Sequence, residues 1–203
     1  MPAQKDTILA ISSSPRRHGN SELLLQFFVR ALEKKGLNVS SIRVNDLNIR
    51  PCQACDSCAK TGECILKDDM QSIYPRVAAA RAMVLASPIY FGTLSGQLKI
   101  FIDRFQCWWQ AKYQLKKPKV TLEMGKLGYF ISVGAMKKKE YCEDALKIAK
   151  IYYHNINYHY YGSLCYRGID EKGAILKKPD ALQEAYTVGE LFAEEILSRK
   201  SNA

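Results

Sequence analysis

The feature that most restricts the fold of this chain is a regular alternation of short apolar runs with segments of helical periodicity. Three runs are almost continuously apolar, at residues 7–11, 82–86 and 127–131, as is typical of parallel strands covered on both faces. Apolar residues recur at three- and four-residue spacing from Leu23 to Leu32 and from Leu98 to Phe105, which predicts two helices. Strand and helix therefore alternate along the chain.

Two further strands complete the predicted sheet. Residues 38–44 are half polar, which places this strand near a sheet edge, and a tyrosine-rich strand is expected within residues 156–166. A last helix is expected to follow Asp180 as its N-cap. Five strands with intervening helices predict an α/β fold, a doubly wound parallel sheet with helices on both faces. At 203 residues, the chain is expected to form a single domain over residues 1–203.

Composition limits the functional classes. The chain has 47% hydrophobic and 25% charged residues, as ordinary globular proteins do. No run reaches the roughly 18 to 20 apolar residues of a membrane-spanning helix. Residues 1–6 lack a signal-peptide pattern, so a cytoplasmic protein is expected. The net charge of +10 comes from scattered Lys and Arg without a nucleic-acid-binding motif, which favours an acidic protein or phosphorylated cofactor as partner over nucleic acid.

A loop rich in hydroxyl groups follows the first strand, and ligands of such sheets bind beyond the carboxyl ends of the strands. It reads SSSPRRHGNSE from Ser12 to Glu22 and runs directly into the first helix. Hydroxyls, helix N-terminal amides and a guanidinium suit a phosphate monoester. The NTP-binding P-loop and dinucleotide fingerprints are both absent from the sequence. A simpler interpretation is that Asn20 or Ser21 only caps the helix.

A second motif follows the third strand. It reads SPIYFGTLSGQLK from Ser87 to Lys99 and continues into FIDR at residues 101–104. Apolar and aromatic side chains with nearby backbone donors suit a flat aromatic cofactor, although a proline-containing turn over core aromatics is the structural alternative. Together the two motifs resemble the NADPH-dependent FMN reductase family of the flavodoxin-like fold, over roughly residues 6–135.

This resemblance implies a flavodoxin-like, five-stranded FMN-binding domain and a flavin-dependent oxidoreductase. It implies that the FMN phosphate is held by Ser12, Ser14, Arg16, Asn20 and Ser21. It also implies that the isoalloxazine ring is bordered by Pro88, Ile89, Tyr90, Phe91 and Gly92. Residues 132–135, with Ser132 and Gly134 as the candidate contacts, follow the fourth predicted strand and are a third candidate wall, although glycine after a strand often marks only a turn. No acid-base dyad or nucleophilic triad is evident, so no residue is assigned a catalytic role.

Four of the seven cysteines crowd into a loop at residues 51–66, after the second strand. They are Cys52, Cys55, Cys58 and Cys64, with the spacing Cys-x2-Cys-x2-Cys-x5-Cys. In a reducing compartment such clusters favour metal or redox chemistry over structural disulfides. The first three cysteines have the close spacing of bacterial ferredoxins, and Gly62 in the longer spacer would let Cys64 complete the same centre. Thiolate quartets also suit zinc, and the thiols could instead stay reduced or pair as disulfides.

The cysteine loop resembles that of the iron-sulfur flavoproteins, a subgroup of the same family, which implies a [4Fe-4S] cluster near FMN. Related cluster-free flavoproteins also carry cysteines before a similar Asp-Asp-Met, here residues 68–70. The leading prediction is an FMN-dependent electron-transfer oxidoreductase between a ferredoxin-type or NAD(P)H donor and an acceptor. The alternatives are a cluster-free NAD(P)H-dependent FMN or quinone reductase, and a zinc- or thiol-based binding module.

The remaining segments give three smaller expectations. Cys107, Cys142 and Cys165 are isolated, so each is expected to be a buried, unreactive thiol. Residues 112–126 lack clear periodicity and are interpreted as an exposed excursion or an oligomer contact. The family resemblance implies a homodimer or homotetramer, with Trp108 and Trp109 as a candidate contact.

Overall fold

The computed structural model describes residues 7–200, with the backbone alone at Lys200, and its centre is a parallel sheet of strand order β2-β1-β3-β5-β6. The strands are β1 (Ile8–Ser12), β2 (Val39–Arg43), β3 (Ala82–Tyr90), β5 (Leu127–Gly134) and β6 (His159–Arg167). The three apolar runs form the inner strands β1, β3 and β5, because their side chains are buried on both faces. The half-polar segment forms the edge strand β2, as predicted.

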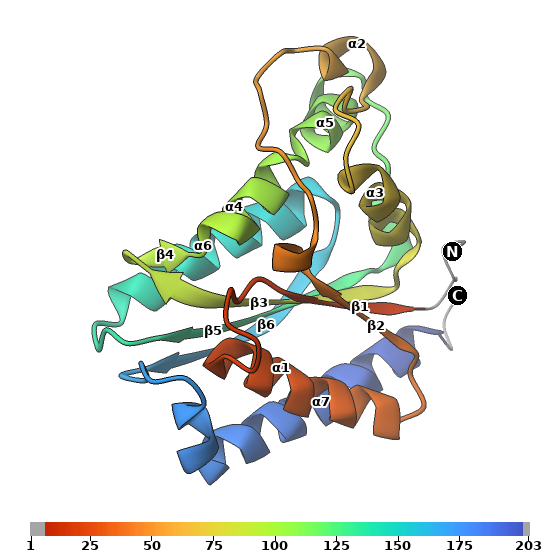
Figure 1. The fold of residues 1–203 in the computed structure, drawn as a ribbon. Coiled ribbons are helices and arrows are strands. Elements are labelled where there is room, and N and C mark those ends of the chain that lie inside the picture. The colour runs from red at the N-terminus through yellow and green to blue at the C-terminus, as the bar shows by residue number, and fades with distance from the viewer. Residues whose placement is uncertain (1–6, 201–203) are drawn as a thin grey trace.

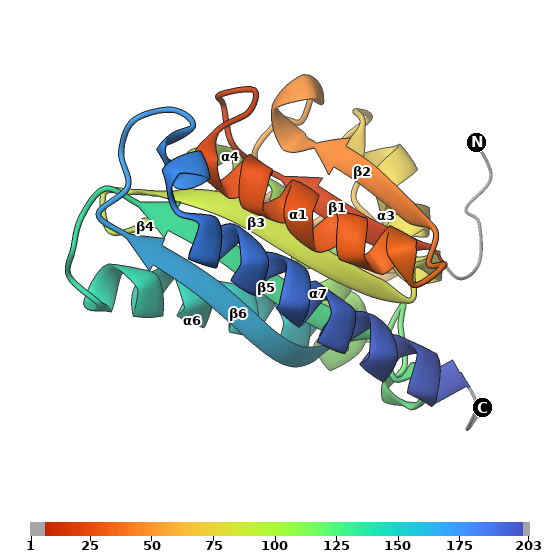
Figure 2. The same cartoon turned by 90° about the horizontal axis from the view of Figure 1, so that it is seen from below.

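Helices cover both faces of this sheet (Figures 1 and 2). Helices α1 and α7 lie against each other on one face, and α3, α4 and α6 lie on the other. The helices are α1 (Asn20–Lys34), α2 (Cys58–Thr61), α3 (Met70–Ala79), α4 (Gly96–Asp103), α5 (Gln106–Trp109), α6 (Glu140–Asn155) and α7 (Pro179–Lys200). Short 3-10 turns at Val44–Asp46, Leu122–Met124 and Ala174–Lys177 and a π-helical turn at Gln110–Gln114 complete the list. The flavodoxin-like architecture is confirmed.

Three details differ from the sequence predictions. The sheet has a sixth strand, the two-residue β4 (Thr93–Leu94), which pairs antiparallel with the end of β3 and is too short to leave a periodic pattern. Helix α7 begins at Pro179, so Asp180 lies inside its first turn and is not the N-cap. Proline favours the first helical position, because its missing N–H would have no partner there. The expectation for residues 1–6 lies outside the described residues.

The predictions for the isolated cysteines were partly wrong. Cys142 in α6 and Cys165 in β6 form a disulfide, with Cα atoms 6.2 Å apart, although 23 positions separate them in the sequence. Packing of α6 beside the sheet brings the two cysteines together. Their spacing along the chain does not predict this contact. Cys107 is a buried free thiol, as predicted, and burial raises its pKa to about 11.

The cysteine loop leaves the sheet altogether. In Figure 1 the chain from β2 rises past α4, carries α2 at its tip beside α5, and returns to α3. This excursion lies on the face of the sheet opposite α1 and α7. Trp108 is buried beneath it, packed against Phe105 and Tyr74. No helix within residues 7–200 is both long and apolar enough to cross a bilayer.

Candidate functional site

The loop from Ser12 to Gly19 joins β1 to α1 at the carboxyl edge of the sheet. The tight path of the loop requires glycine at Gly19, because a Cβ atom there would lie 2.4 Å from Ser14 Oγ. Ser14 Oγ donates to the Arg16 carbonyl at 2.9 Å, and the His18 amide donates to the Glu22 carboxylate. These contacts hold the loop against the first turn of α1. The first amides of any helix have no partner inside it, so this end of α1 attracts anions.

Buried hydroxyl groups without partners distinguish this edge of the sheet. Within the described part of the chain, Ser12 Oγ, Ser21 Oγ and Ser132 Oγ are buried and have no hydrogen-bond partner. Ser12 ends β1, Ser21 lies in the first turn of α1, and Ser132 lies near the end of β5. Buried polar groups normally have partners. Three exceptions lie on the strand-end side of the sheet, and the other unpartnered buried atoms among the described residues are Thr93 Oγ1, Arg43 Nε, Arg104 Nε, Asn155 Oδ1 and Asn157 Oδ1.

The turn after β3 is held by a chain of serines. Ser13 Oγ donates to the Ala86 carbonyl at 3.1 Å, Ser95 Oγ donates to Ser13 Oγ at 2.9 Å, and the Ser95 amide donates to Ser87 Oγ at 3.0 Å. These bonds tie the ends of β1 and β3 to the start of α4. The fixed turn then projects Tyr90 and a fully exposed Phe91, whose φ of 48° is unusual for a non-glycine residue.

A segment after β6 covers the phosphate-type loop. Arg16 Nη1 donates to the Asp170 carbonyl at 3.3 Å. The Asn20 side chain donates to the Glu171 carbonyl at 2.9 Å and accepts from the Ile175 amide at 3.1 Å. The amide of Asn20 is thus engaged with this covering segment, residues 169–175. This segment was not predicted from the sequence, although its place after a strand end was a usable signal.

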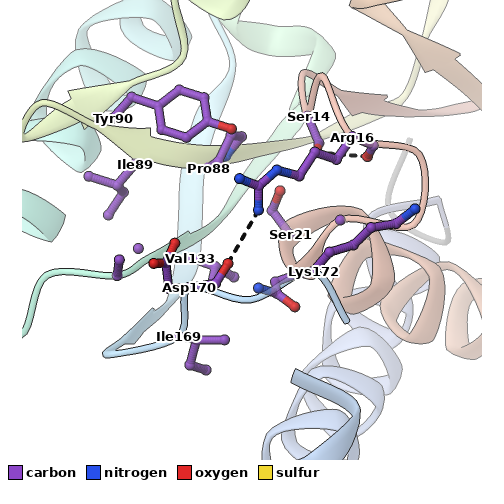
Figure 3. A pocket seen from close by; sticks show the side chains of 14 residues that line it. Ser14, Arg16, Ser21, Pro88, Ile89, Tyr90, Val133, Ile169, Asp170 and Lys172 are labelled. Atoms are coloured by element: carbon purple, nitrogen blue, oxygen red, sulfur yellow. Dashed lines mark hydrogen bonds between the residues drawn. The ribbon is translucent and has the colours of Figure 1, made fainter. Parts of the chain in front are cut away.

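These elements line one pocket with a cavity volume of about 90 Å³, open to solvent (Figure 3). Figure 3 shows Tyr90 and Pro88 on one side, Ile169 on another, and the Arg16 guanidinium reaching between them toward Asp170. The pocket brings together eight predicted residues: Ser14, Arg16, Asn20, Ser21, Pro88, Ile89, Tyr90 and Gly134. Ser12, Phe91, Gly92 and Ser132 are not among its lining residues. Val133 and Ala135, from the third candidate wall, also line it, and the lining residues that the prediction lacked are Gly19, Ile169, Asp170 and Lys172.

The four loop cysteines line a second, separate hollow. Cys52 and Cys55 are exposed, and Cys58 and Cys64 are half-buried. The hydrogen bond between Cys55 and Ser57 lowers the pKa of Cys55, whereas burial and the neighbouring thiols raise the pKa of Cys58. Among the residues that the structure describes, no three His, Cys, Asp or Glu side chains are placed to hold a metal ion. The cysteine hollow and the strand-end pocket share no lining residue.

Several known proteins are similar to this chain. An iron-sulfur flavoprotein from Archaeoglobus fulgidus is 37% identical over 127 residues, which cover 63% of this chain and 61% of the relative. A putative NAD(P)H-dependent FMN-containing oxidoreductase from Bacillus subtilis is 30% identical, over 65% of this chain and 68% of the relative. Three archaeal iron-sulfur flavoproteins are matched over only 61%, 50% and 44% of their own lengths.

Solved structures agree on the fold. An NAD(P)H:quinone oxidoreductase from Methanothermobacter marburgensis superposes with a TM-score of 0.72 at 14% identity, covering 92% of this chain and 96% of the other. A flavodoxin from the domain Archaea gives a TM-score of 0.56 at 13% identity, over 94% and 98% of the two chains. The family model of the NADPH-dependent FMN reductases matches residues 7–156, including both motifs and the cysteine loop. The chain therefore belongs to the NADPH-dependent FMN reductase family.

Proposed function

We propose that this chain is an FMN-dependent electron-transfer oxidoreductase whose strand-end pocket holds the cofactor. The observation that carries the proposal is the Ser21 hydroxyl, which lines the pocket from the first turn of α1 and has no partner among residues 7–200. Arg16 and Lys172 line the same pocket and add positive charge. A hydroxyl donor, a helix N-terminus and two cations match the needs of a phosphate dianion.

The rest of the pocket fits a planar ring. Pro88, Ile89 and Tyr90 offer apolar and aromatic surface on the β3 side, and Val133 and Gly134 offer it on the β5 side. When bound, FMN supplies hydride and single-electron chemistry. The task of the chain is then to hold the phosphate, present the ring to redox partners and limit access of water. Gly134 packs closely against Ile89, since a Cβ at position 134 would lie 3.0 Å from the Ile89 side chain.

Removal of the Arg16 guanidinium tests the phosphate site. Arg16→Ala is expected to weaken FMN binding about 10- to 150-fold, because a hydrogen bond to a charged group contributes about 1.5 to 3 kcal/mol. Arg17→Ala is the matched control, because Arg17 lies in the same loop but pairs with Asp46 and does not line the pocket. Titration of the apoprotein with FMN measures both. Equal affinities in the two folded variants would exclude Arg16 from the phosphate site.

We further propose that Cys52, Cys55, Cys58 and Cys64 ligate a [4Fe-4S] cluster. The donor set fits, since four thiolates are the usual ligands of such clusters and all four line one hollow. The similarity to iron-sulfur flavoproteins also supports it. Anaerobic purification followed by iron, sulfide and flavin analysis is the test. Replacement of any one of the four by Ala should lower the iron content, whereas Cys107→Ala should leave it unchanged at about four irons per chain.

A second candidate is a cluster-free NAD(P)H-dependent FMN or quinone reductase. It is favoured by the positions of the four cysteines, because no three His, Cys, Asp or Glu side chains among the described residues are placed to hold a metal ion. The similarity to the Bacillus subtilis oxidoreductase points the same way. Flavin without stoichiometric iron or sulfide in the anaerobic preparation would establish this candidate and reject the cluster.

The proposed partners follow from charge and exposure. A chain of net charge +10 favours encounter with an acidic, ferredoxin-type donor, and NAD(P)H is the alternative donor. The family resemblance supports assembly into a homodimer or homotetramer, and the neighbouring exposed side chains of Tyr90 and Phe91 are the apolar surface proposed for the contact. Sedimentation of wild-type protein and of Phe91→Ser tests the assembly. An unchanged molecular mass would remove Phe91 from the contact.

A further inference from the structure

A buried arginine lies directly behind the cysteine loop. The Arg104 side chain is fully buried at the end of α4, and its Nη2 donates to Cys64 Sγ at 3.3 Å. Its Nη1 donates to the Arg50 carbonyl at 2.9 Å and to Asp68 Oδ2. Arg50 precedes the loop of residues 51–66 and Asp68 follows it. One guanidinium therefore fastens both ends of the loop and one of its four sulfurs.

The pairing with Asp68 leaves one side of the guanidinium for sulfur. Asp68 Oδ2 also accepts from the Arg50 amide at 3.0 Å, and Asp68 Oδ1 accepts from the Met70 amide at 3.1 Å. The carboxylate therefore accepts a hydrogen bond from Nη1 alone and does not form a bidentate pair. Nη2 is left to face Cys64. Ionised donors form the stronger hydrogen bonds. The arrangement holds the Cys64 sulfur against the guanidinium.

The backbone of Arg104 is fixed as well. Tyr74 Oη donates to the Arg104 carbonyl at 2.8 Å, and the Cys107 thiol donates to the same oxygen at 3.4 Å. Arg104 and all four loop cysteines line the same hollow. The cation is thus anchored by α3 and α5 while its guanidinium reaches the cysteine site.

We propose that Arg104 is a positioning and charge-balancing residue for the centre bound by the cysteine loop: it holds Cys64 in place and supplies the only hydrogen bond from a cation to any of the four sulfurs within the described structure. This inference rests on the proposed cluster. Hydrogen bonds to cluster sulfurs and nearby charge set the reduction potential of iron-sulfur centres. A hydrogen bond to a ligand sulfur stabilises the reduced cluster, which carries one more negative charge than the oxidised cluster, so the Arg104 contact would raise the reduction potential of the cluster.

The test compares reduction potentials in the intact flavoprotein. Arg104→Met removes the charge at similar length, Arg104→Lys retains it, and Lys99→Met removes an exposed cation of the same helix that pairs with Asp103. Spectroelectrochemical titration of the cluster is expected to give a negative shift for Arg104→Met, a smaller shift for Arg104→Lys and none for Lys99→Met. FMN content reports whether each variant has folded. An unchanged potential in Arg104→Met, or the same shift in Lys99→Met, overturns the proposal.

A second measurement covers variants that lose the cluster. Amide hydrogen exchange of residues 62–68 is measured in protein reconstituted with FMN but without iron. Exchange is expected to be faster in Arg104→Met and Arg104→Lys than in Lys99→Met. Both Arg104 variants lose the guanidinium that bonds Cys64 and the two ends of the loop. Equal exchange in all variants contradicts the positioning role. If wild-type protein contains no iron after reconstitution, the cluster proposal is rejected. The exchange data then report separately on the Arg104 contact, so the two failures can be told apart.

Discussion

At the scale of single residues, the buried hydroxyls carry most information about function. A buried hydroxyl without a partner costs about 1 to 3 kcal/mol of folding free energy. Ser21 nevertheless lies 1% exposed at the N-terminus of α1. Such a cost persists at functional sites, where a ligand satisfies the group. Affinity and stability should therefore respond to its removal in opposite directions.

Ser21→Ala is expected to weaken FMN binding about 10-fold or more, because a hydrogen bond to a charged phosphate is lost. The same change should leave the stability of the apoprotein equal or slightly higher, since an unsatisfied buried hydroxyl is removed. Flavin titration and urea unfolding measure the two effects. Ser72→Ala, which removes a surface hydroxyl bonded to the Asp69 carbonyl, should not alter affinity. Loss of stability with unchanged affinity in Ser21→Ala would make Ser21 a purely structural residue.

Lys126 provides a pH-dependent prediction away from the pocket. It is 6% exposed, its Nζ donates to the carbonyls of Ala78 and Ala80, and burial lowers its pKa from 10.5 to about 8. Between these two values the unfolded chain binds more protons than the folded chain, so this residue makes stability rise with pH. The unfolding free energy of wild type minus that of Lys126→Met should become more positive from pH 8 to pH 10.5. A value that stays constant or becomes more negative over this range would contradict the lowered pKa.

At the scale of elements, the sharp turn between β3 and β4 links fold and site. Gly92 has a φ of 80°, and a Cβ there would lie 2.8 Å from the Tyr141 ring. The turn presents Tyr90 to the pocket and is anchored by the Ser13, Ser87 and Ser95 hydroxyls. Its geometry thus depends on a residue without a side chain.

Gly92→Ala is expected to lower stability by about 1 to 2 kcal/mol, because a left-handed conformation costs a non-glycine residue roughly that amount. Gly96→Ala is the control, since that glycine lies in the first turn of α4 and a Cβ there meets nothing within 4 Å. There the change should be neutral or stabilising. Urea unfolding of both variants decides the matter, and equal effects would show that the turn tolerates a side chain.

The elements also show how far the sequence could predict the structure. The apolar runs of β1, β3 and β5 and the helical stripe of α1 were correctly predicted. Burial on both faces of a strand requires a continuous apolar run, and burial of one helix face requires apolar residues at helical spacing. Strand β4 was missed because two residues hold no period. The covering segment and the Cys142–Cys165 disulfide were missed because both depend on contacts between distant parts of the chain. Local motifs predicted the loops of the pocket but not what lies over them.

At the scale of the whole molecule, the positive charge is expected to act on rates of encounter. Thirty Lys and Arg against twenty Asp and Glu give a net charge of +10. Charges of opposite sign on two proteins accelerate association, and salt screens this attraction over about 8 Å at physiological ionic strength. Screening affects a charged protein donor far more than an uncharged small molecule.

Electron transfer from an acidic ferredoxin-type donor should therefore slow several-fold as the ionic strength rises from about 0.01 to 0.15 M. Stopped-flow reduction of the flavin measures this dependence. Electron transfer to an uncharged quinone serves as the control and should change little. A donor rate independent of salt would exclude electrostatic steering by the basic surface.

The covering segment bears on the rates at which a cofactor would enter and leave the pocket. Residues 169–175 are tied to the start of α1 by contacts between protein groups alone: Arg16 with Asp170, and Asn20 with Glu171 and Ile175. If a molecule passes beneath them, these contacts would have to open and re-form, which would slow entry and exit by the same factor. Arg16 takes part both in these contacts and in the proposed phosphate site, so the residence time of a bound cofactor and the strength of its phosphate contact would depend on the same side chain.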